Sequence, residues 1–246
     1  MSADVATPSM PQTPQHTPDP SPERPRVGLF LIPTHRRRVP LVDADAWHGL
    51  DPHRLAWLIR HYTRPGDVVL DLDMHPTVAR ATCYLHRYPA ILVPDGDATR
   101  VRLTGVRARP ERIRRLTDRG VSLLLAGLPR PGGDRLGLRA LTDAMDQWRR
   151  LLRPDGFLLT RLPAQSPQPG QVSARSLVIT AARAAGLRYH QHLPVLLVPL
   201  PETEPRTDPA TAAGTRPALL DGRHIPVHLD LLAFGSTTTD QEAANA

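Results

Sequence analysis

The stretch "GDVVLDLDMHPTVARA", residues 66–81, decides the fold class of this chain. Its run of valine and leucine at 67–72 predicts a central parallel strand that is buried on both faces. A short turn follows, and a helical pattern then begins at Pro76, where proline suits the first turn of a helix. In α/β proteins, a nucleotide-like cofactor usually lies at such a strand–turn–helix junction.

Similar patterns alternate along the rest of the chain. Short apolar runs predict strands at 27–33, 90–95, 121–129, 157–163, 189–200 and 224–235. Amphipathic patterns predict helices at 51–63, 76–88, 136–156 and 171–186. This order predicts an α/β fold with a Rossmann-like, doubly wound, mostly parallel sheet and an antiparallel C-terminal hairpin.

The two ends of the chain differ in composition from the middle. Residues 1–26 are rich in Pro, Ser, Thr and Gln and poor in large apolar side chains, and residues 236–246 are similar. Such segments bury too little apolar surface to offset the entropy of ordering the chain. We therefore expect two disordered tails around one domain at 27–235, which is long enough for a well-buried core.

Charge and cysteine content indicate which binding partners and which cellular compartment to expect. The formal net charge is +7 and all 31 basic side chains are arginine, which favours polyanionic partners such as DNA or RNA. The single cysteine, Cys83, excludes a disulfide within the chain, and its position in a helix predicts a small core residue. Without a signal peptide or about 18 consecutive apolar residues, the chain is predicted to be cytoplasmic and to have no membrane partner.

Several stretches resemble one protein family. "LIRHYTRPGDVVLDLDMHPTVARA" (58–81) looks like the opening of class I S-adenosylmethionine-dependent methyltransferases, in particular the DNA amino-methylases that act on N4 of cytosine or N6 of adenine. "WRRLLRPDGFLLT" (148–160) and the last predicted helix and strands resemble later parts of the same family. The resemblance covers roughly residues 27–235 and implies a class I methyltransferase fold with S-adenosylmethionine as cofactor.

The resemblance places the cofactor at the turn after the first central strand. Asp71 is kept at the strand end and Asp73 replaces an aromatic or apolar residue, while two motif glycines become His75 and Thr77. Glycines there let the backbone approach the cofactor, and these two side chains would occupy part of that space. Asp95 matches the acidic residue that binds ribose hydroxyls, for which a carboxylate is well suited, although "PDGD" also reads as a turn.

The stretch "AGLPRPG" (126–132) corresponds to the family's catalytic motif. That motif holds the exocyclic amino group of a flipped base with a hydrogen-bond acceptor and stacks an aromatic residue on the base. Here Gly127 replaces the acceptor, Leu128 replaces a proline, Pro129 is kept and Arg130 replaces the aromatic residue. Arginine stacks on bases but accepts no hydrogen bond. The loss of the side-chain acceptor at Gly127 predicts a loss of activity on the order of 10²-fold or more.

Two other groups of residues are candidate sites. Arginines are dense at 99–120 and at 36–38, where they either follow a phosphate backbone or form a solvated face. The candidate nucleic-acid contacts are Arg36, Arg37, Arg38, Arg107, Arg109 and Arg112. The eleven histidines lack acidic or cysteine partners at ligand spacing, so we expect no metal site.

Three functions remain open. The first is an active methylase of a nucleic-acid amino group, and the second is a methyltransferase for a small molecule or a protein. The third is a degenerate member of the family that keeps the fold as a binding or regulatory module. The substitutions in both the cofactor motif and the catalytic motif favour the third function, with weak or no catalysis.

Overall fold

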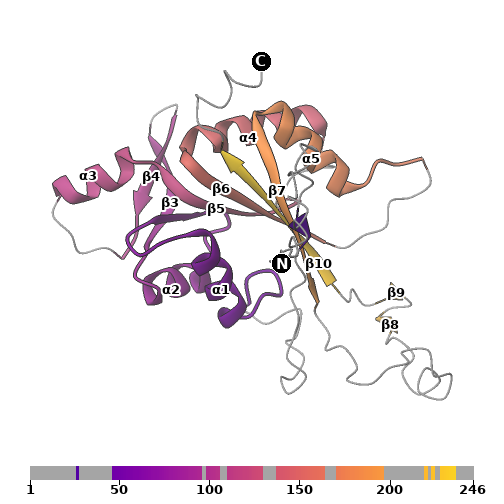
Figure 1. The fold of residues 1–246 in the computed structure, drawn as a ribbon, viewed down its shortest axis with the longest axis horizontal. Coiled ribbons are helices and arrows are strands. Elements are labelled where there is room, and N and C mark those ends of the chain that lie inside the picture. Colours follow the sequence, from indigo (N-terminus) through magenta and orange to yellow (C-terminus); the bar gives the residue numbers. More distant parts are fainter. Residues whose placement is uncertain are drawn as a thin grey trace, which may run out of the picture.

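The computed structural model describes residues 26–27, 46–95, 98–105, 110–129, 137–163, 170–196, 219–220, 223–224 and 228–236. These residues form an eight-stranded sheet with the strand order β1-β7-β10-β6-β5-β2-β3-β4, and helices lie against it (Figure 1). The expected tails at 1–26 and 236–246 lie outside the described residues, except for Arg26 and Ser236.

The elements follow the predicted alternation of strands and helices. The strands are β1 (Arg26–Val27), β2 (Val68–Asp71), β3 (Tyr88–Asp95), β4 (Ala98–Leu103), β5 (Val121–Gly127), β6 (Leu152–Pro163), β7 (Leu187–Leu196) and β10 (His228–Ser236), with β8 (Leu219–Leu220) and β9 (Arg223–His224) forming a separate pair. The helices are α1 (Pro52–Tyr62), α2 (Pro76–Tyr84), α3 (Pro110–Asp118), α4 (Leu138–Leu151) and α5 (Ala174–Ala184).

The strand order and directions confirm the predicted fold class. β2 pairs in parallel with β3 and β5, and β5 pairs in parallel with β6. β10 is antiparallel to both of its neighbours, β6 and β7. The result is a Rossmann-like sheet of class I methyltransferase type, in which the reversed strand of the C-terminal hairpin lies between two other strands.

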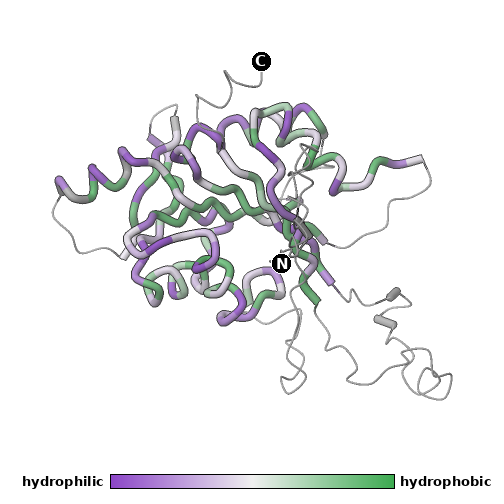
Figure 2. Tube along the Cα trace, in the orientation of Figure 1, coloured by the Kyte–Doolittle hydropathy of each residue, from purple (hydrophilic) through white to green (hydrophobic). Residues whose placement is uncertain are grey.

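The helices cover the sheet on both faces and bury its apolar side chains. On β5, Leu123 and Leu125 belong to a core that includes Leu58 of α1, whereas Leu124 belongs to a core that includes Met145 of α4. Because successive residues of a strand face opposite sides, a strand covered on both faces needs apolar residues at every position. Figure 2 shows this as continuous hydrophobic strands between helices of mixed hydropathy.

The arginine-dense segment 99–120, in which no strand was predicted, contains one. Its first part is strand β4, which pairs antiparallel with β3 from Asp95↔Ala98 to Ala90↔Leu103, and α3 follows. The two-residue alternation of Arg100 and Arg102 with Val101 and Leu103 is typical of a strand that is exposed on one side. The high arginine content concealed this alternation in the sequence.

Two helices also present different faces from those predicted. In α1, the amphipathic pattern predicted for 51–63 does not bury Trp57, which is 46% exposed and stacks on His61. In α2, Cys83 was expected in the core but is exposed, because Val78 and Ala81 lie on the buried side of the helix. Helix α2 ends at Tyr84 rather than at residue 88.

Candidate functional site

Asp71 shapes the turn between β2 and α2. Its carboxylate is 4% exposed and accepts hydrogen bonds from the backbone N–H groups of Asp73 (3.0 Å) and His75 (2.6 Å). Burial raises the pKa of Asp71 to about 6, although the two hydrogen bonds act in the opposite direction. Each carboxylate oxygen therefore already accepts one hydrogen bond from the backbone of the turn.

The N-terminus of α2 is capped from within the chain. The Nδ1 atom of His75 accepts a hydrogen bond from the Thr77 N–H (3.3 Å), and Pro76 has no N–H to offer. The Val78 N–H donates to the His75 carbonyl (3.0 Å), and Thr77 is 1% exposed. Free N–H groups at a helix N-terminus are a common anion site, and here these donors already have partners.

Asp73 links the carboxyl ends of β2 and β5. Its Oδ2 atom accepts the N–H of Gly127 (2.7 Å) and lies 2.8 Å from Nε2 of His48. The Asp73 side chain is 12% exposed and the His48 side chain is 33% exposed. The ends of β2 and β5 flank the point where the strand order reverses, which is where ligands of doubly wound sheets usually bind.

Gly127 is required by the packing of this cluster. A Cβ atom at position 127 would lie 2.3 Å from Nε2 of His48 and 3.0 Å from Oδ2 of Asp73. His48 itself is held in a turn whose flanking residues Trp47 and Leu50 are fully buried and bridge to each other. The glycine that stands at the family's acceptor position therefore makes room for the imidazole ring.

The rest of the predicted catalytic stretch continues from β5 toward β6. Leu128 is buried and donates its N–H to the carbonyl of Arg161 on β6 (2.8 Å), and Pro129 follows. Arg130 lies outside the described residues. Burial lowers the pKa of the Arg161 guanidinium, and the negative charge of Asp73 opposes that shift. The charges of Arg161 and Asp73 therefore interact.

The structure separates Asp95 from the other predicted cofactor residues. Leu70 pairs with Ala90, so Asp71 lies level with Ile91, and Asp95 is four residues farther along β3, or about 13 Å. Asp95 is exposed and forms an ion pair with Arg100 of β4 (2.6 Å). This position at the β3–β4 connection is consistent with a turn residue, and the ribose contact stays a prediction.

The cavity beside the turn is small. It has a volume of about 210 Å³ and is lined by Asp71, Met74 and His75 together with Ala90 and Ile91 of β3. Ligand pockets usually measure about 300–1,000 Å³. This cavity is therefore below the usual size range of ligand pockets.

The remaining candidates fall largely outside the described residues. Arg36, Arg37, Arg38, Arg107 and Arg109 are not among them, and Arg112 lies in α3 without a described side chain. Within the described residues, no group of three or more His, Cys, Asp or Glu side chains is placed to hold a metal ion. In the same part of the chain, no helix has the length and apolarity to cross a membrane.

Sequence reasoning missed His48 and Arg161. The pair His48-Gly49 indicates a turn before α1, but no local pattern shows that this turn covers the end of β5. Arg161 lies within a strand whose pattern indicates burial, without any sign that it approaches Asp73. Both residues reach the cluster only through the pairing of strands and the packing of α1.

No protein-family model matches this chain, and no curated protein matches it. Among solved structures, a geranyl diphosphate C-methyltransferase from Streptomyces coelicolor A3(2), in complex with Mg²⁺, geranyl-S-thiolodiphosphate and S-adenosyl-L-homocysteine, is 16% identical, with 77% of each chain covered and a TM-score of 0.44. A methyltransferase from Pyrococcus furiosus is 13% identical over 80% of this chain and 94% of its own, with a TM-score of 0.40. The antibiotic-resistance methyltransferase Kmr is 18% identical over 74% and 93%, with a TM-score of 0.35. The fold assignment rests on the strand order given above.

Proposed function

We propose that this chain is a methyltransferase-fold protein with little or no methyl-transfer activity, which acts as a binding or regulatory module. The supporting observation is the closed cluster at the ends of β2 and β5. There, the Asp73 carboxylate accepts a hydrogen bond from the Gly127 N–H and is hydrogen-bonded to the His48 ring. The groups that would meet a cofactor at this edge are bonded to one another.

Displacing these contacts would be costly for a ligand. Hydrogen bonds to charged groups contribute roughly 1.5–3 kcal/mol each, so a ligand that replaced both bonds of Asp73 without re-forming them would lose roughly 3–6 kcal/mol. At 1.4 kcal/mol for each factor of ten, this loss lowers affinity by roughly 10²–10⁴-fold. A donor that binds an open site at micromolar concentration would then bind this one only at sub-millimolar concentration or more weakly.

S-adenosylmethionine is the donor to test, because a geranyl diphosphate methyltransferase among the similar structures was determined in complex with it. Methylation of a DNA amino group has the weakest support. Gly127 offers no side-chain acceptor, and its N–H is bonded to Asp73. A base placed there would find no side-chain acceptor for its amino group.

A second candidate function is an active methyltransferase for a small molecule, a protein or RNA. The observation that favours it is the pair formed by His48 and Asp73. An imidazole that is oriented by a carboxylate and is partly exposed at the ends of the central strands has the arrangement of a general base. In that case His48 would take the proton from a hydroxyl, thiol or amine as the methyl group is transferred.

Calorimetric titration of the full chain with S-adenosylmethionine tests the proposal. We expect no saturable binding at micromolar donor concentrations, and a micromolar dissociation constant would contradict the proposal. If the donor binds, labelled-methyl transfer to DNA, RNA, protein and small-molecule pools identifies the substrate class. Loss of that transfer in His48→Gln with donor binding unchanged would support the second candidate.

Two variants locate the cause of weak binding. Asp73→Ala removes the acceptor that closes the cluster, and we expect it to bind the donor at least about tenfold more tightly than the wild type. Asp143→Ala, at an exposed position of α4, is the matched control for the lost charge. Donor binding by His75→Gly with Thr77→Gly, but not by Asp73→Ala, would assign the block to the two side chains that replace the motif glycines.

A further inference from the structure

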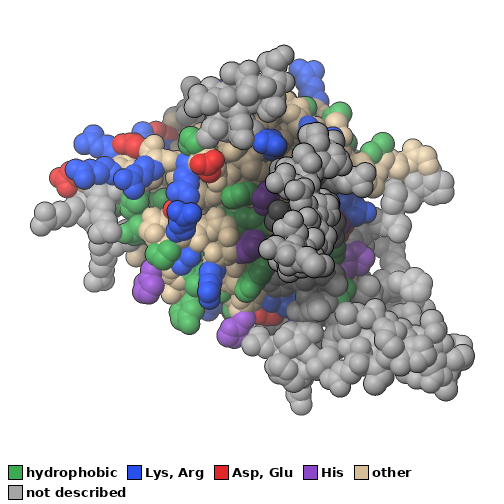
Figure 3. All heavy atoms as spheres, in the orientation of Figure 1, with side chains coloured by type: hydrophobic (Ala, Val, Ile, Leu, Met, Phe, Trp, Pro, Cys, Tyr) green, Lys and Arg blue, Asp and Glu red, His purple; other side chains and the backbone are tan. Residues whose placement is uncertain are grey.

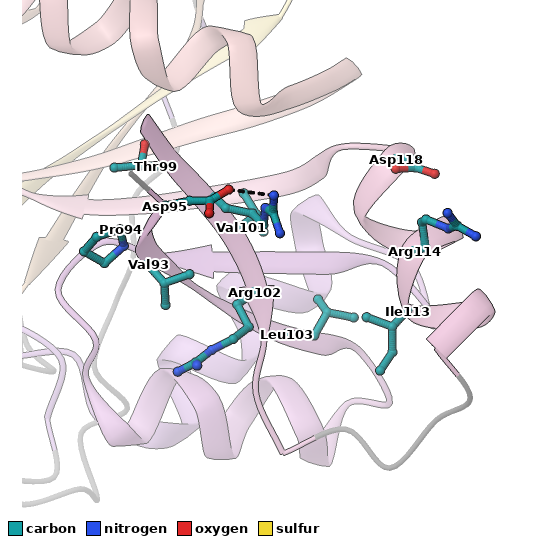
Figure 4. A pocket seen from close by; sticks show the side chains of 11 residues that line it. Val93, Pro94, Asp95, Thr99, Val101, Arg102, Leu103, Ile113, Arg114 and Asp118 are labelled. Carbon is teal, nitrogen blue, oxygen red and sulfur yellow. Dashed lines mark ion pairs between the residues drawn. The ribbon is translucent and has the colours of Figure 1, made fainter. Parts of the chain in front are cut away.

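Most of the described arginines lie on the protein surface. Figure 3 shows basic side chains spread over one face of the molecule. In the cavity between the hairpin β3–β4 and α3, Arg102 and Arg114 point in different directions, and Asp95 pairs with the exposed Arg100 (Figure 4). These guanidinium groups do not converge on one ligand site.

Arg161 of β6 differs from the other arginines of the protein interior. Buried Arg54 pairs with Asp51, and buried Arg87 donates to Thr63. The Arg161 side chain is half-buried, and its Nε atom is buried without a hydrogen-bond partner among the described residues. Burial lowers the pKa of its guanidinium. A cation that has lost water without gaining hydrogen bonds is stabilised when an anion binds to it.

The register of the sheet places Arg161 beside His48. Arg161 pairs with Gly127 across β6 and β5, and neighbouring strands are about 4.8 Å apart. Leu159, two residues before Arg161, belongs to the core that α1 covers, so the Arg161 side chain leaves the sheet on the α1 side. On that side, the His48 ring fills the space where a side chain of Gly127 would lie.

The order across three neighbouring strand ends is therefore Asp73, His48 and Arg161. Asp73 follows β2, and its Oδ2 atom is bonded to the Gly127 N–H and to the His48 ring. The negative charge of Asp73 favours the charged form of Arg161. In the described part of the chain, however, no carboxylate lies within 4 Å of the Arg161 guanidinium. His48 thus separates the carboxylate from a cation that has no anion in direct contact.

We infer that Arg161 binds the carboxylate or phosphate group of a small-molecule ligand at the carboxyl ends of β5 and β6. A guanidinium group donates two parallel hydrogen bonds to two oxygens of such a group. The carboxyl ends of the strands are also where ligands of doubly wound sheets bind. The inference rests on the proposed function only in that the chain acts as a binding module. It needs neither donor binding nor methyl transfer.

Calorimetric titration of the full chain with four anions, in a chloride buffer of constant ionic strength, tests the inference. Inorganic phosphate and diphosphate represent one source of the anionic group, and acetate and citrate represent the other. Arg161→Gln removes the charge, and Arg161→Lys keeps the charge without the two parallel donors. The matched control is Arg188→Gln, which removes an exposed charge at the start of β7, at the opposite edge of the sheet.

We expect at least one of the two anion series to bind the wild type saturably. Arg161→Gln should bind that anion at least about tenfold more weakly, because the charged hydrogen bonds are lost. Arg161→Lys should have an intermediate affinity, and Arg188→Gln should bind as the wild type does. Circular dichroism checks the fold of each variant. If the Arg161 variants do not fold, the anion should still protect Arg161 of the wild type from phenylglyoxal, as mapped by mass spectrometry.

Several results would overturn the inference. These are the absence of saturable binding of all four anions, equal affinities of the wild type and Arg161→Gln, and equal losses in Arg161→Gln and Arg188→Gln. Unchanged modification of Arg161 by phenylglyoxal in the presence of the bound anion would overturn it as well. Micromolar binding of S-adenosylmethionine would contradict the proposed function alone, because the titrations with the four anions decide this inference separately.

Discussion

Asp71→Asn should remove a pH dependence of folding stability that one buried carboxyl creates. The pKa of Asp71 is 3.8 when unperturbed and about 6 in the folded protein, because burial disfavours its charged form. Between these two values the folded state keeps a proton that the unfolded chain has released. The free energy of unfolding therefore falls as pH rises through this window, by about 3 kcal/mol in total.

The substitution also changes the hydrogen bonds of the turn. Asparagine has one acceptor oxygen, so it can accept a hydrogen bond from the N–H of either Asp73 or His75. Its NH₂ group then faces the second N–H, and this lost hydrogen bond lowers the unfolding free energy by roughly 1–3 kcal/mol. We therefore expect Asp71→Asn to be less stable than the wild type at pH 4. By pH 7 the difference in unfolding free energy should have moved in favour of the variant by about 2.4 kcal/mol, because part of the change has already occurred at pH 4.

Urea denaturation followed by tryptophan fluorescence at pH values from 4 to 7 measures this difference. The m-values of the two proteins should agree, so that the midpoints report stability alone. Asp143→Asn, on the exposed side of α4, is the control for removing a carboxylate. The difference in unfolding free energy between wild type and Asp71→Asn could instead stay constant over this pH range or move in favour of the wild type. Either result would refute the reasoning.

Two further substitutions test the packing around the candidate site. Gly127→Ala should destabilise the fold by about 1–3 kcal/mol and displace His48, because the new Cβ would lie 2.3 Å from its Nε2. Gly235→Ala is the control, since its nearest neighbour would be at 3.7 Å, and equal urea midpoints for the two variants would contradict this account. Arg87→Met should lower the unfolding free energy by about 2–4 kcal/mol, because buried Arg87 donates to both the carbonyl and the hydroxyl oxygen of Thr63. If the urea midpoint of Arg87→Met shifts by less than about 1 kcal/mol in unfolding free energy, this prediction is wrong, and water replaces the donors of Arg87.

Much of the fold could be predicted from local patterns. The apolar runs at 67–72 and 121–129 are strands β2 and β5, and proline at position 76 starts α2 as expected. The hairpin β3–β4 could not be recognised, because arginine at alternate positions resembles a solvated loop or helix face. The exposure of Cys83 also escaped prediction, because it depends on which side of α2 meets α1 and the sheet.

The sequence by itself determined the order of strands and helices, because the periodicity of burial is a local property of each segment. It also identified Asp73 and Gly127 as positions where the family motifs are altered, and Asp71 as a position where they are kept. The tertiary structure alone decided what those alterations do. His48 is 25 residues from Asp73, and Gly127 is 54 residues from it, so no local pattern connects them. Only the parallel pairing of β2 with β5 and the packing of α1 bring them together at the carboxyl ends of these strands.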